Sequence, residues 1–145
     1  MLCFRGSPTS EGSALFDGQG QIWIDQNRNN ANRQGRPISL TIWKGENIWV
    51  DGITWRQSQF WHTYVAHSRT VTMTNLDMNS TSNSKWKAVN TDEVNTWNSR
   101  GVRIGNWTVT GGDNVNQPIY VTSCIYSYSN CDSSRIPITG IRWET

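Results

Sequence analysis

Short stretches of alternating apolar and polar residues run through most of the chain, and they predict β-strands. The clearest is residues 38–43, where three aliphatic side chains share one face and Ser39, Thr41 and Trp43 share the other. Further strands are predicted at residues 21–24, 48–50, 52–55, 60–67, 69–75, 85–89, 102–104, 106–110, 119–128 and 136–143. Short strands separated by turn signals are typical of a mainly β fold, either an antiparallel sandwich or a curved sheet.

Residues 38–51 contain the pattern of a β-hairpin. A three-residue loop at 45–47 keeps the aliphatic side chains of both strands on one face. The same register pairs Trp43 with Trp49 on the other face, beside Thr41 and Asp51. The sequence therefore predicts two neighbouring tryptophans next to polar side chains.

One short helix is expected over about residues 92–100. Asn90 or Thr91 can cap it, and Asp92 and Glu93 would stand in its first turn, where the helix dipole favours acids. Gly101 occupies the position at which helices commonly stop. We expect this helix to pack on the sheet or to be clasped by it.

The composition narrows the class of protein. The 145 residues fit a single domain, 1–145, which we expect to be a piece of a longer protein. Nine tryptophans, together with an abundance of Asn, Ser and Thr, argue against a helical bundle and against disorder. A net charge of +2 is too small to imply nucleic acid, and no apolar run is long enough for membrane insertion.

Groups suited to catalysis or metal binding are sparse. His62 and His67 are the candidate bases, but five residues apart on a strand they face opposite ways. The one local pair of acids, Asp92-Glu93, is explained by the predicted helix start. These observations predict that the chain is not an enzyme and needs no cofactor or metal. A small hydrolase with one histidine in a cleft beside an acid is the remaining catalytic alternative.

The three cysteines leave their pairing open. Cys124 and Cys131 are close enough in sequence to close a short disulfide loop, which would leave Cys3 unpaired. All three can equally be free thiols. No CxxC pair is present, which argues against a zinc site.

The abundance of both aromatic and short polar side chains suits carbohydrate binding. Indole and phenol rings stack on the C–H face of a sugar, while amides, hydroxyls and charged groups bond its hydroxyls. The predicted glycan-binding residues are Trp43, Trp49, Thr41, Asp51, Arg56, Trp61, His62, Tyr126 and Tyr128. The alternative is a structural or protein-binding β-domain, such as a capsid protrusion or pilus-tip module, whose tryptophans are buried.

Three segments resemble the heads of rotavirus spikes. They are Phe60-Trp61, the Asn/Ser-rich turn 79–84 that leads into Lys85-Trp86-Lys87, and residues 107–111. Rotavirus spike heads are glycan-binding domains of the outer-capsid attachment protein. The resemblance implies a lectin on the virion surface whose partners are host cell-surface glycans and the remainder of the spike. No sugar-contacting residue of that family matches a position here.

Overall fold

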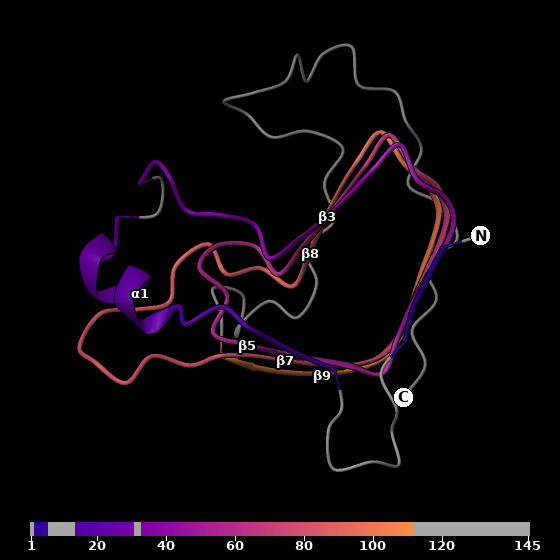
Figure 1. Cartoon of the computed structure of the whole chain (residues 1–145). Coiled ribbons are helices and arrows are strands. Elements are labelled where there is room, and N and C mark those ends of the chain that lie inside the picture. The colour runs from indigo at the N-terminus through magenta and orange to yellow at the C-terminus, as the bar shows by residue number, and fades with distance from the viewer. Residues whose placement is uncertain (1, 6–13, 31–32, 112–145) are drawn as a thin grey trace. The chain divides into compact units, whose positions relative to one another are not determined.

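The computed structural model describes residues 2–5, 14–30 and 33–111, and these form nine strands and one helix (Figure 1). They belong to the first of two compact units, residues 1–115. The strands are β1 (Leu2–Arg5), β2 (Ala14–Asp17), β3 (Leu40–Trp43), β4 (Glu46–Asp51), β5 (Ile53–Arg56), β6 (Thr63–Ala66), β7 (Arg69–Ser80), β8 (Val94–Trp97) and β9 (Arg100–Gly111). The helix is α1 (Gln21–Asn27).

Every strand pair in the described ranges is parallel. Sheet B has the order β3-β6-β8, and sheet A has the order β1-β4-β7-β5-β2, with β9 also paired to β7. A parallel partner requires a crossover, so each strand stacks on the strand from the previous turn of the chain. The chain winds as a parallel β-helix. The prediction of a mainly β fold is confirmed, whereas the antiparallel arrangement and the hairpin at 38–51 are wrong.

Successive coils of the β-helix add strands to the same sheets. Ile48 pairs with Val71, and Val71 pairs with Val102, so the three residues occupy the same position in three successive coils. The interval along the chain from Val71 to Val102 is longer than that from Ile48 to Val71. Strands β4 and β5 flank Gly52, and both pair with the long strand β7. The second interval is longer because the connector between β7 and β8 spans residues 81–93.

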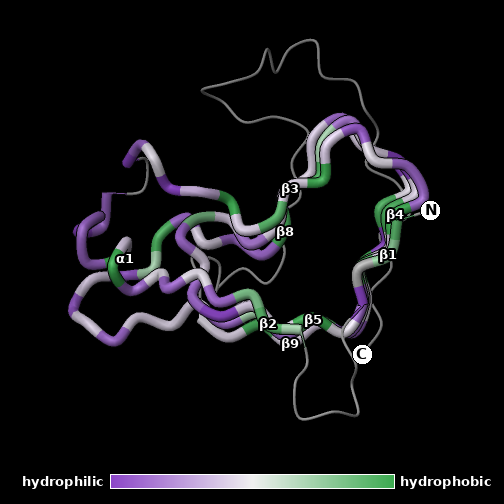
Figure 2. Tube along the Cα trace, in the orientation of Figure 1, coloured by the Kyte–Doolittle hydropathy of each residue, from purple (hydrophilic) through white to green (hydrophobic). Residues whose placement is uncertain are grey.

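The core lies inside the coils, where equivalent side chains stack from one coil to the next. Val50 lies at the level of Met73 and Trp55 at that of Met78, and all four are fully or almost fully buried. The Phe16 ring stacks on Trp55 with 5.2 Å between centroids. In Figure 2 the hydrophobic colour gathers on the stacked strands, while the connectors near α1 are mostly hydrophilic. The β-helix is therefore held together by ladders of apolar side chains running across its coils.

The corners between the sides are made by residues with positive φ. Lys44, His67 and Asn98 have φ of 52°, 51° and 44° and follow the aligned ends of β3, β6 and β8. A second corner uses Gly52, Asn75 and Asn106 in the same way. The left-handed conformation is readily adopted by Gly and Asn, which suits Gly52, Asn75, Asn98 and Asn106 to these corners.

The predicted helix at 92–100 is wrong, because this segment contains β8 and the turn into β9. Asn90 lies in a turn and Gly101 near the start of β9, with φ of 50° and 64°, and neither is at a helix end. The helix lies instead at Gln21–Asn27, where a strand was predicted over residues 21–24. A short apolar run cannot by itself distinguish a helix from a strand. Residues 85–89 are not a strand either.

Several predictions fall beyond the described ranges. They are the strands at 119–128 and 136–143 and the pairing of Cys124 with Cys131. Cys3, on β1, is an exposed free thiol. In the ranges that the structure describes, no helix has the length and hydropathy to cross a membrane.

Candidate functional site

The outward side of sheet B carries a group of aromatic and amide side chains. Strand alternation directs Ile42 and Val65 into the core and turns Thr41, Trp43 and Tyr64 toward the other side of the sheet. Register aligns Thr41, Tyr64 and Asn95 in one row, and Trp43 and Trp97 in a second row on either side of Ala66. We call this surface, together with Trp61, the aromatic face; its residues are Thr41, Trp43, Trp61, Tyr64, Asn95 and Trp97.

Ring contacts fix the orientation of the face. Trp43, which is 56% exposed, meets His67 edge to face at 4.6 Å between centroids. The Asn98 amide bonds Nδ1 of His67 at 2.9 Å. At the other edge, Trp61 contacts Tyr64 at 5.6 Å and stacks on Phe60 at 4.8 Å. These contacts restrict the side chains before any ligand binds, which lowers the entropic cost of binding.

Arg36 packs against the edge of the aromatic face at Phe60 and Trp61. Its side chain is buried and donates to the backbone oxygens of Gln59 and Val89. The guanidinium also lies 4.9 Å from the centroid of the Phe60 ring. Arg36 therefore joins its loop to the connector that carries Asp92, and its role here is structural.

Asp92 brings a carboxylate to the aromatic face. Its Oδ2 accepts a hydrogen bond of 3.2 Å from Nδ2 of Asn95, which belongs to the face. Asp51 and Asp77 lie on sheet A, and Asp25 lies on α1. Asp92 is thus an acid that a hydrogen bond ties to this surface, whereas these three aspartates lie on other elements.

A buried polar chain lies behind Asp92. The backbone oxygen of Asp92 accepts from the His62 backbone N–H at 2.8 Å and from the His62 ring Nδ1 at 3.2 Å. Because a carbonyl only accepts, Nδ1 carries the ring proton, and Nε2 accepts from Ser80 Oγ at 3.0 Å. Ser80 Oγ accepts in turn from the Ser58 backbone N–H at 3.1 Å. This Ser-His-carbonyl chain is not a nucleophile triad, because a backbone carbonyl stands where a triad has a carboxylate and His62 is only 1% exposed.

Burial lowers the pKa of His62 from 6.5 to about 4, because the charged ring would lose its hydration, and the hydrogen bonds to backbone oxygens only partly offset this. Between these two pH values the unfolded chain binds a proton that the folded chain lacks. We therefore expect the free energy of unfolding to be highest above pH 6.5 and to fall by up to about 3 kcal/mol as the pH drops to 4. Denaturant titrations across this range measure it. His62→Asn should flatten the curve, and parallel curves for the two proteins would contradict the assignment.

The structure brings together only some of the predicted glycan-binding residues. Thr41, Trp43 and Trp61 lie on the aromatic face, and His62 lies buried beneath it. Tyr126 and Tyr128 fall outside the described residues. The binding roles of these residues stay predictions.

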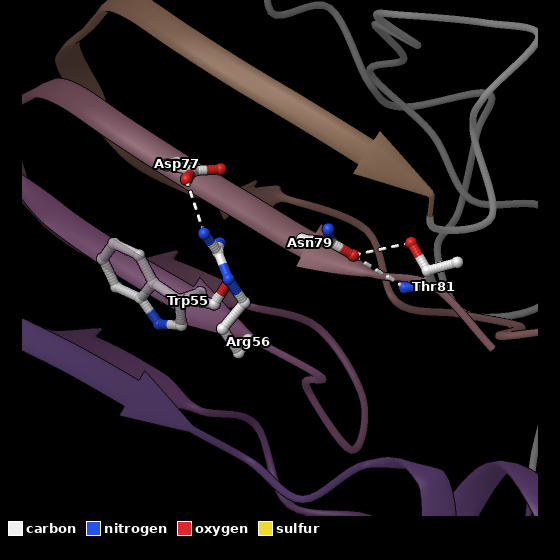
Figure 3. A network of polar contacts seen from close by, with 5 residues as sticks. All are labelled: Trp55, Arg56, Asp77, Asn79 and Thr81. Carbon is white, nitrogen blue, oxygen red and sulfur yellow. Dashed lines mark hydrogen bonds and ion pairs between the residues drawn. The ribbon is translucent and has the colours of Figure 1, made fainter. Parts of the chain in front are cut away.

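The other three predicted residues lie on sheet A. Trp49 is 47% exposed there and is not beside Trp43, because consecutive sides of a coil separate them. Asp51 has a lowered pKa through hydrogen bonds from Asn75 and Thr74 and the charge of Arg5. Figure 3 shows Arg56 directed at Asp77, with an ion pair of 2.7 Å.

Sequence reasoning missed Tyr64, Asn95 and Asp92. Trp97, which is 42% exposed, was not among the predicted site residues either. The predicted helix hid three of these four residues, because it placed Asp92 in its first turn and included Asn95 and Trp97 in its span. The spacing between Tyr64 and Asn95 equals that between the paired residues Val71 and Val102, and this shared spacing is the signal that connects them.

Known proteins share this architecture and sequence. An exopolygalacturonase of Cochliobolus carbonum is 33% identical over 102 residues, covering 70% of this chain and 23% of that protein. The alpha-L-rhamnosidase rgxB of Aspergillus niger is 29% identical over 102 residues, covering 70% of this chain and 24% of its own. The crystal structure of endo-xylogalacturonan hydrolase from Aspergillus tubingensis superposes with a TM-score of 0.64 at 29% identity, covering 69% of this chain and 27% of that one. The chain spans about a quarter of the length of these relatives.

These relatives overturn the viral interpretation. The resemblance to rotavirus spike heads rested on short segments of common residues, whereas the fungal hydrolases match over most of this chain and in fold. The lectin function, the virion-surface location, and the partnership with host glycans and a spike are therefore wrong, and the alternative of a structural β-domain is not supported. The prediction that the chain is not an enzyme is contradicted as well, because the relatives are named for hydrolase activities. That prediction had explained Asp92 by a helix that does not form.

The family model described as "Glycosyl hydrolases family 28" matches residues 8–131. This range includes the strands from β2 to β9 and the connector that carries Asp92. The chain belongs to glycosyl hydrolases family 28.

Proposed function

We propose that the protein hydrolyses glycosidic bonds in pectic polysaccharides of the galacturonan type. The aromatic face is the substrate surface, and Asp92 is one of the catalytic carboxylates. The observation that carries the proposal is the hydrogen bond between Asp92 and Asn95, which sets an acid beside exposed rings. The relatives named for polygalacturonase and xylogalacturonan hydrolase activity support the substrate class.

The chemistry requires a second carboxylate. Glycosidases use one carboxyl group as general acid and another as nucleophile or as base for a water molecule. In the sequence, Asp113 closely follows the end of β9, as the segment with Asp92 follows β7. We include Asp113, which lies outside the described residues, as the candidate for this second role.

The direct test measures the reducing ends that the full-length protein releases from polygalacturonate, xylogalacturonan and rhamnogalacturonan, with xylan as the unrelated control. We expect hydrolysis of at least one galacturonan-containing substrate and none of xylan. Folded protein that cleaves none of the three would overturn the proposal. The order of rates among them identifies which side groups the face accepts.

Trp43→Ala should weaken binding of galacturonan oligosaccharides about tenfold, because a stacked ring contributes roughly 1–1.5 kcal/mol beyond the area it buries. Titration calorimetry measures the Kd. Trp49→Ala is the matched control, since Trp49 is similarly exposed but lies on sheet A. Equal effects of the two substitutions would show that sheet B is not the binding surface.

A further inference from the structure

A buried histidine that takes no part in the proposed chemistry holds the backbone of the proposed catalytic acid. His62 precedes β6 in one coil, and Asp92 precedes β8 in the next coil. Both N–H groups of His62, on the backbone and on the ring, donate to the same oxygen, that of Asp92. One residue thus makes two hydrogen bonds to a single carbonyl oxygen, which can accept both.

The contact holds the end of the connector 81–93, where Asp92 meets the aromatic face through Asn95. This connector is longer than the equivalent one between β5 and β6, and most of its residues are exposed or half-buried. At its end Thr91 is fully buried and donates to the Ala88 oxygen at 3.1 Å, and the Thr63 N–H donates to the Glu93 oxygen at 3.1 Å. With His62, these bonds hold the peptides on both sides of Asp92.

The ring of His62 is itself held. Ser80 Oγ donates to Nε2, and Ser80 is oriented by the Ser58 N–H, so each polar atom along the path has a partner. A side chain that is itself held by hydrogen bonds restrains the group that it contacts. Asp92 Oδ2 then accepts from Asn95 while its backbone is restrained by these hydrogen bonds.

We infer that His62 is a positioning residue that, with Ser80, sets the carboxylate of Asp92 for catalysis. The inference rests on the proposed function, in which Asp92 acts on the glycosidic bond. A displacement of about 1 Å at a catalytic group can lower the rate by roughly 10²-fold. His62 is not part of the aromatic face, so its substitution should leave substrate binding, and with it KM, little changed.

The test compares kcat and KM of full-length variants on the best galacturonan substrate. His62→Leu removes the ring donor, and we expect kcat to fall by roughly 10- to 100-fold with KM within about twofold. In His62→Asn the side-chain amide stands where Nδ1 stood and can donate to the Asp92 oxygen, so it should recover most of kcat. Thr63→Val is the matched control, because Thr63 is equally buried and its hydroxyl has no partner among the described residues.

Each outcome decides one proposal. Unchanged kcat in His62→Leu, or no recovery in His62→Asn while Thr63→Val keeps full activity, overturns the positioning role. Should His62→Leu not fold, Ser80→Ala decides, with a several-fold loss in kcat at constant KM supporting the role and an unchanged kcat refuting it. An Asp92→Asn variant that retains full activity would instead reject the proposed function, whatever His62 does.

Discussion

Asp92→Asn should lower kcat for galacturonan hydrolysis by roughly 10²- to 10⁴-fold, the range that a positioned general acid or base contributes. The amide cannot take or give the proton, yet it keeps the size of the carboxylate and can still bond Asn95. We therefore expect KM to stay within a few-fold of its original value. Initial rates of reducing-end release over a range of substrate concentrations measure both parameters.

Asp77→Asn is the matched control for this substitution. It makes the same chemical change on sheet A, where Asp77 pairs with Arg56 on a partly exposed surface (Figure 3). A pair of this kind contributes at most about 1 kcal/mol to stability, and it lies on a different sheet from Asn95. Comparable losses of kcat in the two variants would mean that Asp92 has no special role.

Trp55→Ala should lower the free energy of unfolding by about 3–5 kcal/mol, a large share of a domain's stability. Trp55 is fully buried, lies level with Met78 in the next coil and stacks on Phe16. Its removal would open a cavity between three neighbouring turns of the chain. Urea unfolding followed by circular dichroism gives the change.

Trp55→Phe is the informative companion. The indole Nε1 is buried without a partner among the described atoms, so phenylalanine keeps a ring against Phe16 and removes an unbonded donor. We expect a cost of about 1 kcal/mol, because the lost volume and the lost unpaired group act in opposite directions. If phenylalanine cost as much as alanine, the stacking with Phe16 would not be the source of the stability.

The alternation along residues 38–43 correctly predicts which side chains of β3 are buried, because period two depends only on the local backbone. The partner of that strand depends on distant residues. At one constant spacing along the chain, the core residues of one coil are followed by those of the next: Ile42, Ile48, Val50, Ile53 and Trp55 by Val65, Val71, Met73, Leu76 and Met78. This hidden repeat is the sequence signature of stacked coils.

The erroneous helix has a specific physical cause. Asn, Asp and Gly are favoured at helix ends, and Asn and Gly are equally favoured at left-handed corners. Residues 90–101 have Asn, Asp and Gly at positions that suit either the ends of a helix or the corners that flank a strand. Only the pairing of β8 with β6 decides between these two structures. That choice removed Asp92, Asn95 and Trp97 from consideration as site residues. By contrast, Trp43 was a reasonable candidate from sequence because its outward orientation follows from local alternation.

The stacked corners at Lys44, His67 and Asn98 dictate where the chain can change length. A residue gained or lost between two corners would turn every later side chain of that strand inside out, so such insertions and deletions should be purged by selection. The connector at 81–93 is already longer than its counterpart at 57–62, and it ends beside Asp92. Evolution can therefore remodel the edge of the proposed substrate surface by lengthening this loop, while the β-helix itself stays the same.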